Sequence, residues 1–191
     1  MGELEKIRVQ VENCQKCGLC KTRTHSVPGE GSPNADIMFI GEGPGKNEDL
    51  HGTPFVGAAG KFLDVLLESI GLKRADVFIT NVVKCRPPSN RDPEPNEKIA
   101  CWPYLVEQIK LIKPKLIVTL GRHAMNIFLP GTKISEIHGQ AKRYKGIWQE
   151  KQVYFAMYHP AVALYNGSYR EILLEDMQKI HKVLEKLDSV E

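Results

Sequence analysis

The sequence predicts an α/β fold in which a parallel β-sheet carries helices on both of its faces. Short apolar runs of strand length recur along the chain and alternate with longer segments whose apolar residues follow helical spacing. Such alternation is typical of β-α-β crossovers, which produce parallel strands. The 191 residues suit one domain of this kind and suffice to bury a core. We therefore expect a single domain over residues 1–191.

The expected elements follow from apolar spacing and from Gly and Pro breaks. Strands are expected at residues 36–40, 77–80, 116–120 and 153–157. Helices are expected at 3–12, 58–70, 96–112, from 122 to about 128, and 169–187. Loops or irregular strand fill 18–35, 86–96 and 130–146.

Composition excludes several classes of protein. A hydrophobic content of 42% with mixed charge excludes disorder. No apolar run approaches the roughly 18 residues of a membrane span, and the N-terminus reads as a charged helix instead of a signal peptide. We expect a cytoplasmic protein without membrane contact and, for lack of an obvious association surface, a monomer. A net charge of +3 permits nucleic acid as a partner without requiring it.

Five cysteines indicate a metal centre. Cys14-x-x-Cys17-x-x-Cys20 lies in polar surroundings, which is atypical of buried thiols, and Cys85 and Cys101 follow later. Disulfides are not expected in a cytoplasmic chain. A metal or iron–sulfur site is therefore favoured over ordinary buried cysteines.

Residues 41–57 form a loop directly after the first expected strand. Its five glycines and two prolines predict a backbone that comes close to a ligand, the alternative being an exposed turn. It is not a phosphate loop, because Gly41-x-Gly43-x-Gly45 lacks the dinucleotide spacing and Asn47 stands where a P-loop needs Ser or Thr. Its acidic residues would also repel phosphate. They suit a carboxylate placed for chemistry.

Polar residues follow each expected strand. Glu42, Asn81, Gly121 with Arg122, and His159 come just after the four carboxyl ends. In parallel sheets, ligands bind beyond these ends. We therefore expect a carboxylate, an amide and an imidazole to meet at one edge of the sheet.

These residues also carry a family resemblance. The sequence resembles the family 4 uracil-DNA glycosylases, the iron–sulfur members of the uracil-DNA glycosylase superfamily, over nearly its whole length. The matching motifs are Cys14-x-x-Cys17, Gly41-Glu42-x-Pro44-Gly45 with Glu48-Asp49, Gly52-x-Pro54-Phe55-Val56-Gly57, Asn81 before Lys84-Cys85-Arg86-Pro87-Pro88, and His159-Pro160. Gly43 departs from the Ala that is usual in this family. Family 5 proteins lack the acidic residue that Glu42 provides.

The resemblance implies a fold, a reaction and a cofactor. The fold is a three-layer α/β/α sandwich around a four-stranded parallel sheet. The reaction is hydrolysis of the N-glycosidic bond of deoxyuridine in single- or double-stranded DNA, which leaves an abasic site. The cofactor is a [4Fe-4S] cluster on Cys14, Cys17, Cys85 and Cys101, with Cys20 outside the ligand set. A zinc ion on four cysteines has the same ligand count and stays open.

The chemistry assigns roles within the expected pocket. Asn81 would pair with uracil and reject cytosine, unless it merely closes a turn. Phe55 would stack on the base, the alternative being a core aromatic, while small residues at Gly41 and Gly43 would let the backbone approach it. His159 would donate a hydrogen bond to uracil O2, and Glu42 would activate water or stabilise the sugar cation. The other histidines are expected to be surface or structural; they are His25, His51, His123, His138 and His181.

Residues 160–170 resemble the minor-groove loop of the family. Leu164 would fill the space left by the flipped base, or else pack on the last helix. The expected phosphate contacts are Lys84, Arg86, Arg91, Lys142, Arg143 and Arg170. Competing functions are a sibling glycosylase for another deaminated base, an iron–sulfur redox protein and a non-catalytic DNA-binding module. A sliding-clamp contact does not follow from the sequence.

Overall fold

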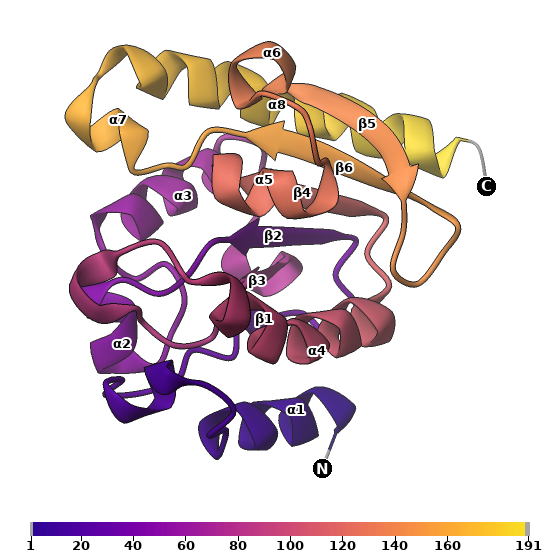
Figure 1. Ribbon diagram of the computed structural model, residues 1–191. Coiled ribbons are helices and arrows are strands. Elements are labelled where there is room, and N and C mark those ends of the chain that lie inside the picture. The colour runs from indigo at the N-terminus through magenta and orange to yellow at the C-terminus, as the bar shows by residue number, and fades with distance from the viewer. Residues whose placement is uncertain (1, 190–191) are drawn as a thin grey trace.

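Four parallel strands form the centre of the sheet, as the sequence predicts. In the computed structural model, which describes residues 2–189, they are β2 (Ile37–Gly41), β3 (Phe78–Asn81), β4 (Leu116–Leu120) and β6 (Lys151–Met157). They pair in the order β3-β2-β4-β6 (Figure 1). Every residue of β2, β3 and β4 is buried, because helices cover both faces of the sheet.

Two further strands extend the sheet to six. β1 (Glu30–Gly31) pairs antiparallel with β3, and β5 (Gln140–Lys145) pairs antiparallel with β6. The sequence predicts only loop or irregular strand there, so these edges are additions to the expected sheet. All six residues of β5 are exposed. The strand therefore lacks the apolar alternation by which a half-buried strand is recognised.

The helices include two that the sequence predictions place in loops. α2 (Lys46–His51) lies within the 41–57 loop, and α6 (Ile134–Ile137) lies within 130–146. A third short helix, α7 (Val162–Tyr165), lies within residues 160–170, which the family resemblance assigns to a loop. The others agree with the expected elements to within a few residues: α1 (Glu3–Glu12), α3 (Ala58–Glu68), α4 (Pro95–Ile112), α5 (Arg122–Phe128) and α8 (Ser168–Asp188). None of the helices described is long and apolar enough to cross a membrane.

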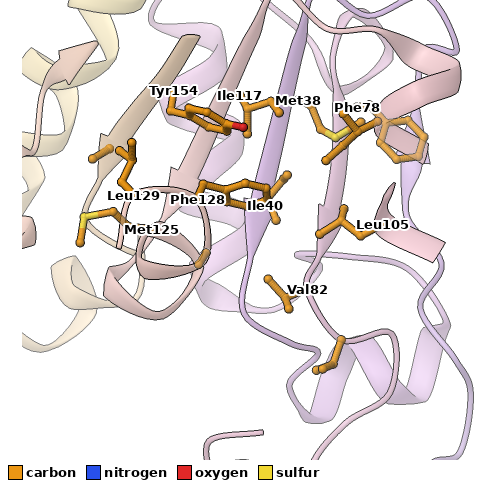
Figure 2. Packing of buried hydrophobic residues seen from close by; sticks show 14 of the residues in the cluster. Met38, Ile40, Phe78, Val82, Leu105, Ile117, Met125, Phe128, Leu129 and Tyr154 are labelled. Atoms are coloured by element: carbon orange, nitrogen blue, oxygen red, sulfur yellow. The ribbon is translucent and has the colours of Figure 1, made fainter. Parts of the chain in front are cut away.

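The helices form the two outer layers of the predicted sandwich. Met38 and Ile40 of β2 face α4 and α5, while the alternate residues Ile37 and Phe39 face α3 and α8. Figure 2 shows the first of these cores, where Leu105 of α4 and Met125 and Phe128 of α5 pack against strand residues. Period-2 alternation across a doubly covered sheet thus produces two separate apolar layers.

The N-terminal helix packs outside this sandwich. α1 lies beside α4 (Figure 1). Ile7 and Val11 of α1 pack in one cluster with Tyr104 of α4. This contact brings the Cys14 segment to the start of α4, near Cys101.

The strand order creates a crevice at the carboxyl edge. β2 connects toward β3 on one side, whereas β4 connects toward β6 on the other. Connections that diverge from neighbouring strands leave a gap beyond the strand ends, which is the usual ligand site of such sheets.

Candidate active site

A cleft of about 400 Å³ opens at this edge. Its walls include Glu42 after β2, Asn81 at the end of β3 and His159 after β6. Phe55, from the loop between α2 and α3, forms a further wall. The structure therefore brings together the predicted carboxylate, amide and imidazole, with Phe55 beside them. Gly121 and Arg122, which also follow a strand end, line a second pocket that shares Glu42 and His159 with this cleft.

Two glycines let the cleft walls approach one another. A Cβ at Gly41 would lie 2.4 Å from Asn81 Oδ1 and 2.7 Å from the Phe55 ring, so a larger residue would displace both. At Gly43, a Cβ would lie 2.7 Å from a Val83 methyl. An Ala at this position would therefore require the Val83 side chain to move, whereas Gly43 fits against Val83 as it stands.

Phe55 is held in a left-handed backbone conformation, with a φ of 53°. Arg74 donates hydrogen bonds to the carbonyl oxygens of Pro54 and Phe55, and carboxylates from β1 and α3 hold Arg74 in turn. A Cβ at Gly60 would lie 1.6 Å from the Phe55 carbonyl oxygen, so only glycine permits this contact. The Phe55 ring stacks on His159 at 5.5 Å between centroids and 25° between planes. A flat aromatic wall is therefore built before any ligand binds.

Glu48 braces the same loop. Its Oε1 accepts hydrogen bonds from the backbone N–H groups of Val56 and Gly57, both at 2.9 Å, and its Oε2 accepts one from Gly45 at 3.1 Å. Both oxygens are engaged with the backbone. The acidic residue of this cleft with an unengaged oxygen is Glu42.

Asn81 presents an unpartnered amide to the cleft. The residue is 2% exposed, and its Oδ1 has no hydrogen-bond partner among the described residues. A buried acceptor left unpaired costs about 1–3 kcal/mol. A ligand that donates a hydrogen bond to Oδ1 would recover this cost.

Lys84 does not reach the surface, which corrects its assignment as a phosphate contact. It is 1% exposed, and its Nζ donates to the Asn81 carbonyl oxygen at 2.8 Å and to Gln108 Oε1 at 2.7 Å. Burial lowers the pKa of Lys84 to about 7. The positive charge of Lys84 led to its prediction as a DNA contact. In the structure, its side chain is buried and hydrogen-bonds to the backbone of Asn81.

His159 is a neutral donor toward the cleft. Its Nδ1 accepts a hydrogen bond from the Ala161 backbone N–H at 3.1 Å, so the proton of the neutral ring resides on Nε2. Burial lowers the pKa of His159 to about 4. At neutral pH the ring therefore offers an N–H without a positive charge.

Glu42 lies near a lysine, a histidine and one more carboxylate. Its Oε1 is buried and lacks a hydrogen-bond partner among the described residues; His123 Nδ1 lies 3.5 Å away and Lys98 Nζ 4.0 Å away. His123 also lies 3.4 Å from Asp92. Burial raises the pKa of Glu42. The sequence prediction treated His123 as surface or structural, because nothing in local spacing links it to Glu42.

Comparison with known proteins supplies the family. Residues 28–187 match the family model described as the uracil DNA glycosylase superfamily. A type-4 uracil-DNA glycosylase of Sulfurisphaera tokodaii is 52% identical over 190 residues, covering 96% of this chain and 86% of that protein. One from Saccharolobus solfataricus is 50% identical over 190 residues, covering 96% and 88%. One from Archaeoglobus fulgidus is 48% identical over 191 residues, covering 97% and 96%. This chain belongs to the type-4 uracil-DNA glycosylases.

The family resemblance also directs attention to residues outside the cleft. Leu164 lies on α7, is 47% exposed and follows His159 closely, while the neighbouring Tyr165 is 90% exposed. The alternative of Leu164 packing on the last helix is less consistent with this exposure. The arginines are exposed or half-buried and partly engaged: Arg86 with Asn90, Arg91 with Glu97, and Arg170 over the Phe62 ring. Lys142 and Arg143 lie exposed on β5.

The cysteines of this type-4 family member gather in one place. Cys14, Cys17, Cys85 and Cys101 line a single cavity, and Cys20 lines it too. Arg23 Nη1 donates toward Cys85 Sγ at 3.0 Å, and the Lys84 backbone N–H donates to Cys101 Sγ at 3.2 Å. Such donors stabilise the thiolate form, which is the metal ligand.

Proposed function

We propose that this protein excises uracil from DNA by hydrolysing its N-glycosidic bond. The observation that carries the proposal is the buried Asn81 side chain, whose Oδ1 has no hydrogen-bond partner among the described residues, in a cleft that also holds Glu42 and His159. Neither a redox protein nor a passive DNA-binding module needs this combination. Membership of the type-4 family supports the same reaction.

Base selection would rest on Asn81. Its unpartnered Oδ1 suits the N3–H of uracil, and its Nδ2–H₂ suits O4. Cytosine presents an acceptor at N3 and a donor at the exocyclic amine, so both pairs would fail. Each mismatch leaves a buried group unpaired, at about 1–3 kcal/mol. Phe55 would stack on the uracil face, with Gly41 and Gly43 giving the base room.

Bond cleavage would use His159 and Glu42. The C1′–N1 bond breaks, the electron pair departs with uracil, and the water oxygen bonds to C1′ as the water loses a proton. Nε2–H of His159 would stabilise the negative charge that grows on uracil O2. Glu42 would take the water proton, and its anionic form would also stabilise the cationic sugar.

DNA would reach the cleft by nucleotide flipping, because the glycosidic bond is inaccessible within a duplex. Leu164 would occupy the gap left in the stack. Arg86, Arg91, Arg170, Lys142 and Arg143 are the proposed phosphate contacts. Single- and double-stranded DNA are both proposed substrates, and the protein is proposed to act as a monomer.

We propose that Cys14, Cys17, Cys85 and Cys101 hold a [4Fe-4S] cluster. Among the described residues, the set that brings three ligand atoms within 4.8 Å of one another is Glu42, Asp92 and His123, not the cysteines. Zinc at about 2.3 Å from each sulfur needs all four sulfurs closer together than that. Thiolates spaced more widely suit a cluster in which each sulfur binds a different iron. The cluster would tie the N-terminal segment to loop 85–101 within one domain and transfer no electrons in this reaction.

Single-turnover excision from labelled oligonucleotides tests the function. Protein purified without oxygen or chelators is mixed with strands that carry uracil, hypoxanthine, xanthine or no lesion, and abasic sites are cleaved by alkali. We expect rapid cleavage at uracil alone. Cleavage at another deaminated base in preference to uracil would assign a sibling activity, and cleavage at none would contradict the proposal.

A further inference from the structure

His123 bridges two carboxylates at the side of the cleft. Its Nδ1 lies 3.5 Å from Glu42 Oε1, and its Nε2 lies 3.4 Å from Asp92 Oδ2. The side chain of Asp92 is 66% exposed, whereas that of Glu42 is 23% exposed. The imidazole therefore lies between a carboxylate in solvent and one inside the cleft.

Arg122 determines which nitrogen of His123 carries the proton. Arg122 Nε lies 3.1 Å from His123 Nε2. A guanidinium only donates hydrogen bonds, so Nε2 must accept. A neutral imidazole that accepts at Nε2 carries its proton on Nδ1, and Nδ1 is the nitrogen that faces Glu42.

We propose that His123 is a positioning residue whose Nδ1–H holds the Glu42 carboxylate ionised and oriented for its work on water. This inference rests on the proposed function, because His123 acts through Glu42. The Glu42 oxygen that faces His123 is the buried one without another hydrogen-bond partner among the described residues. Contacts of this kind commonly tighten when substrate binds, so 3.5 Å in the free enzyme suits the role.

The surrounding charges do not favour a metal ion at this cluster. Glu42, Asp92 and His123 present ligand atoms within 4.8 Å of one another. Lys98 faces Glu42 at 4.0 Å, and Arg122 occupies Nε2 of the imidazole. These two cations already balance the two carboxylates, so the arrangement is accounted for without a metal ion.

Some neighbours of Glu42 raise its pKa and others lower it, so the direction of the pKa change can be predicted for each substitution. Burial raises the pKa of Glu42, and the negative charge of Asp92 raises it as well. His123 and Arg122 of α5 and Lys98 of α4 lower it. His159 shares the cleft but is neutral above a pKa of about 4. Removing His123 should therefore make Glu42 harder to ionise, and removing the charge of Asp92 should make it easier.

The test is the pH profile of single-turnover uracil excision by the cluster-containing protein. We compare wild type with His123→Ala, His123→Asn, Asp92→Asn and Glu42→Gln. In His123→Ala, the acidic limb should move up by about one pH unit, as expected for one lost hydrogen bond to a charged group. The rate below the limb should then fall about tenfold, with a smaller loss above it. His123→Asn keeps an N–H near the Nδ1 position and should restore the limb toward wild type, while Asp92→Asn should not raise it.

The outcomes separate the inference from the proposed function. Wild type that releases no uracil, or Glu42→Gln with the wild-type rate, would refute the proposed chemistry and the inference together. An inactive Glu42→Gln combined with an unshifted limb in His123→Ala would overturn the inference alone. The inference would also be overturned if His123→Ala lowered the excision rate by the same factor at every pH, because that result indicates a structural role only. Should His123→Ala fold poorly, His123→Phe keeps a ring without the N–H, and an unshifted limb in that variant would overturn the inference.

Discussion

At the scale of single residues, the cleft is defined by polar atoms that the protein itself does not satisfy. Asn81 Oδ1 and Glu42 Oε1 are both buried without hydrogen-bond partners, and only Trp148 Nε1 joins them among the described residues. Burying such an atom destabilises the folded state, because the atom loses its hydrogen bonds to water and gains none within the protein. Two of them in one cleft indicate a site arranged for a polar ligand.

Replacement of Asn81 should abolish base selection. We expect Asn81→Ala to lower kcat/KM for uracil excision by about 10²-fold or more, because two hydrogen bonds to the base are lost. Asn34→Ala is the control, since Asn34 is exposed and precedes β2, at the end of the strand opposite the cleft. Equal rates for Asn81→Ala and wild type would remove Asn81 from the pocket assignment.

The pKa of His159 predicts an acid-sensitive contribution to stability. The folded state holds this pKa at about 4, below the unfolded value of about 6.5. Stability from the neutral ring is therefore complete above about pH 6.5 and is lost as the pH falls toward 4. We expect the free energy of unfolding of wild type to fall by about 2 kcal/mol more than that of His159→Gln between pH 7 and pH 4.5. Urea unfolding measures the difference, and parallel losses in both proteins would contradict it.

The site residues that could be predicted from the sequence are those that come directly at the end of a recognisable strand. Glu42, Asn81 and His159 each follow a recognisable apolar strand, and parallel strands place their carboxyl ends at one edge. His123 and Arg74 could not be predicted, because their partners are distant in sequence. For Lys84 the prediction was wrong, since charge alone does not reveal burial.

At the scale of elements, short helices place side chains that strands cannot. α2 carries the Glu48 brace of the 41–57 loop, and α7 carries Leu164 beside His159. Neither helix has enough turns to show a periodic apolar pattern, so the sequence predicted loop at both. The two edge strands also lack a recognisable apolar pattern. β1 has only two residues, and every residue of β5 is exposed.

α7 gives a prediction that depends on the form of the DNA. We expect Leu164→Ala to slow excision from double-stranded DNA about tenfold and to leave single-stranded DNA nearly unaffected, because only a duplex has a stack to fill. Leu111→Ala is the matched control, since Leu111 is 42% exposed on α4 at the end of the helix that precedes β4. An equal effect on both DNA forms would indicate that Leu164 serves packing instead.

At the scale of the whole molecule, the cysteine cavity joins segments that are distant in sequence. Cys14 and Cys17 follow α1, whereas Cys85 follows β3 and Cys101 lies in α4. A shared cluster would close a chain loop of some seventy residues and fix the loop that carries Arg86 and Arg91. The position of the cysteines thus links the proposed cofactor to the proposed phosphate contacts Arg86 and Arg91.

Two cysteine variants separate a ligand from a bystander. We expect Cys17→Ser to lose the visible absorbance of the cluster and about 3–5 kcal/mol of unfolding free energy, as for opening a long cross-linked loop. Cys20→Ser should keep both. Loss of absorbance in Cys20→Ser with retention in Cys17→Ser would reassign the fourth ligand.

The rigid wall made by Phe55 has a consequence for turnover. Arg74, Gly60 and Glu48 fix the loop before substrate arrives, so the wall meets a detached base as readily as an attached one. Contacts that are equally strong in substrate and transition state speed no chemical step, and those that the detached base retains stabilise the complex with the product. Free uracil should therefore compete with DNA for the cleft, and repair by this enzyme should slow as the base it liberates accumulates.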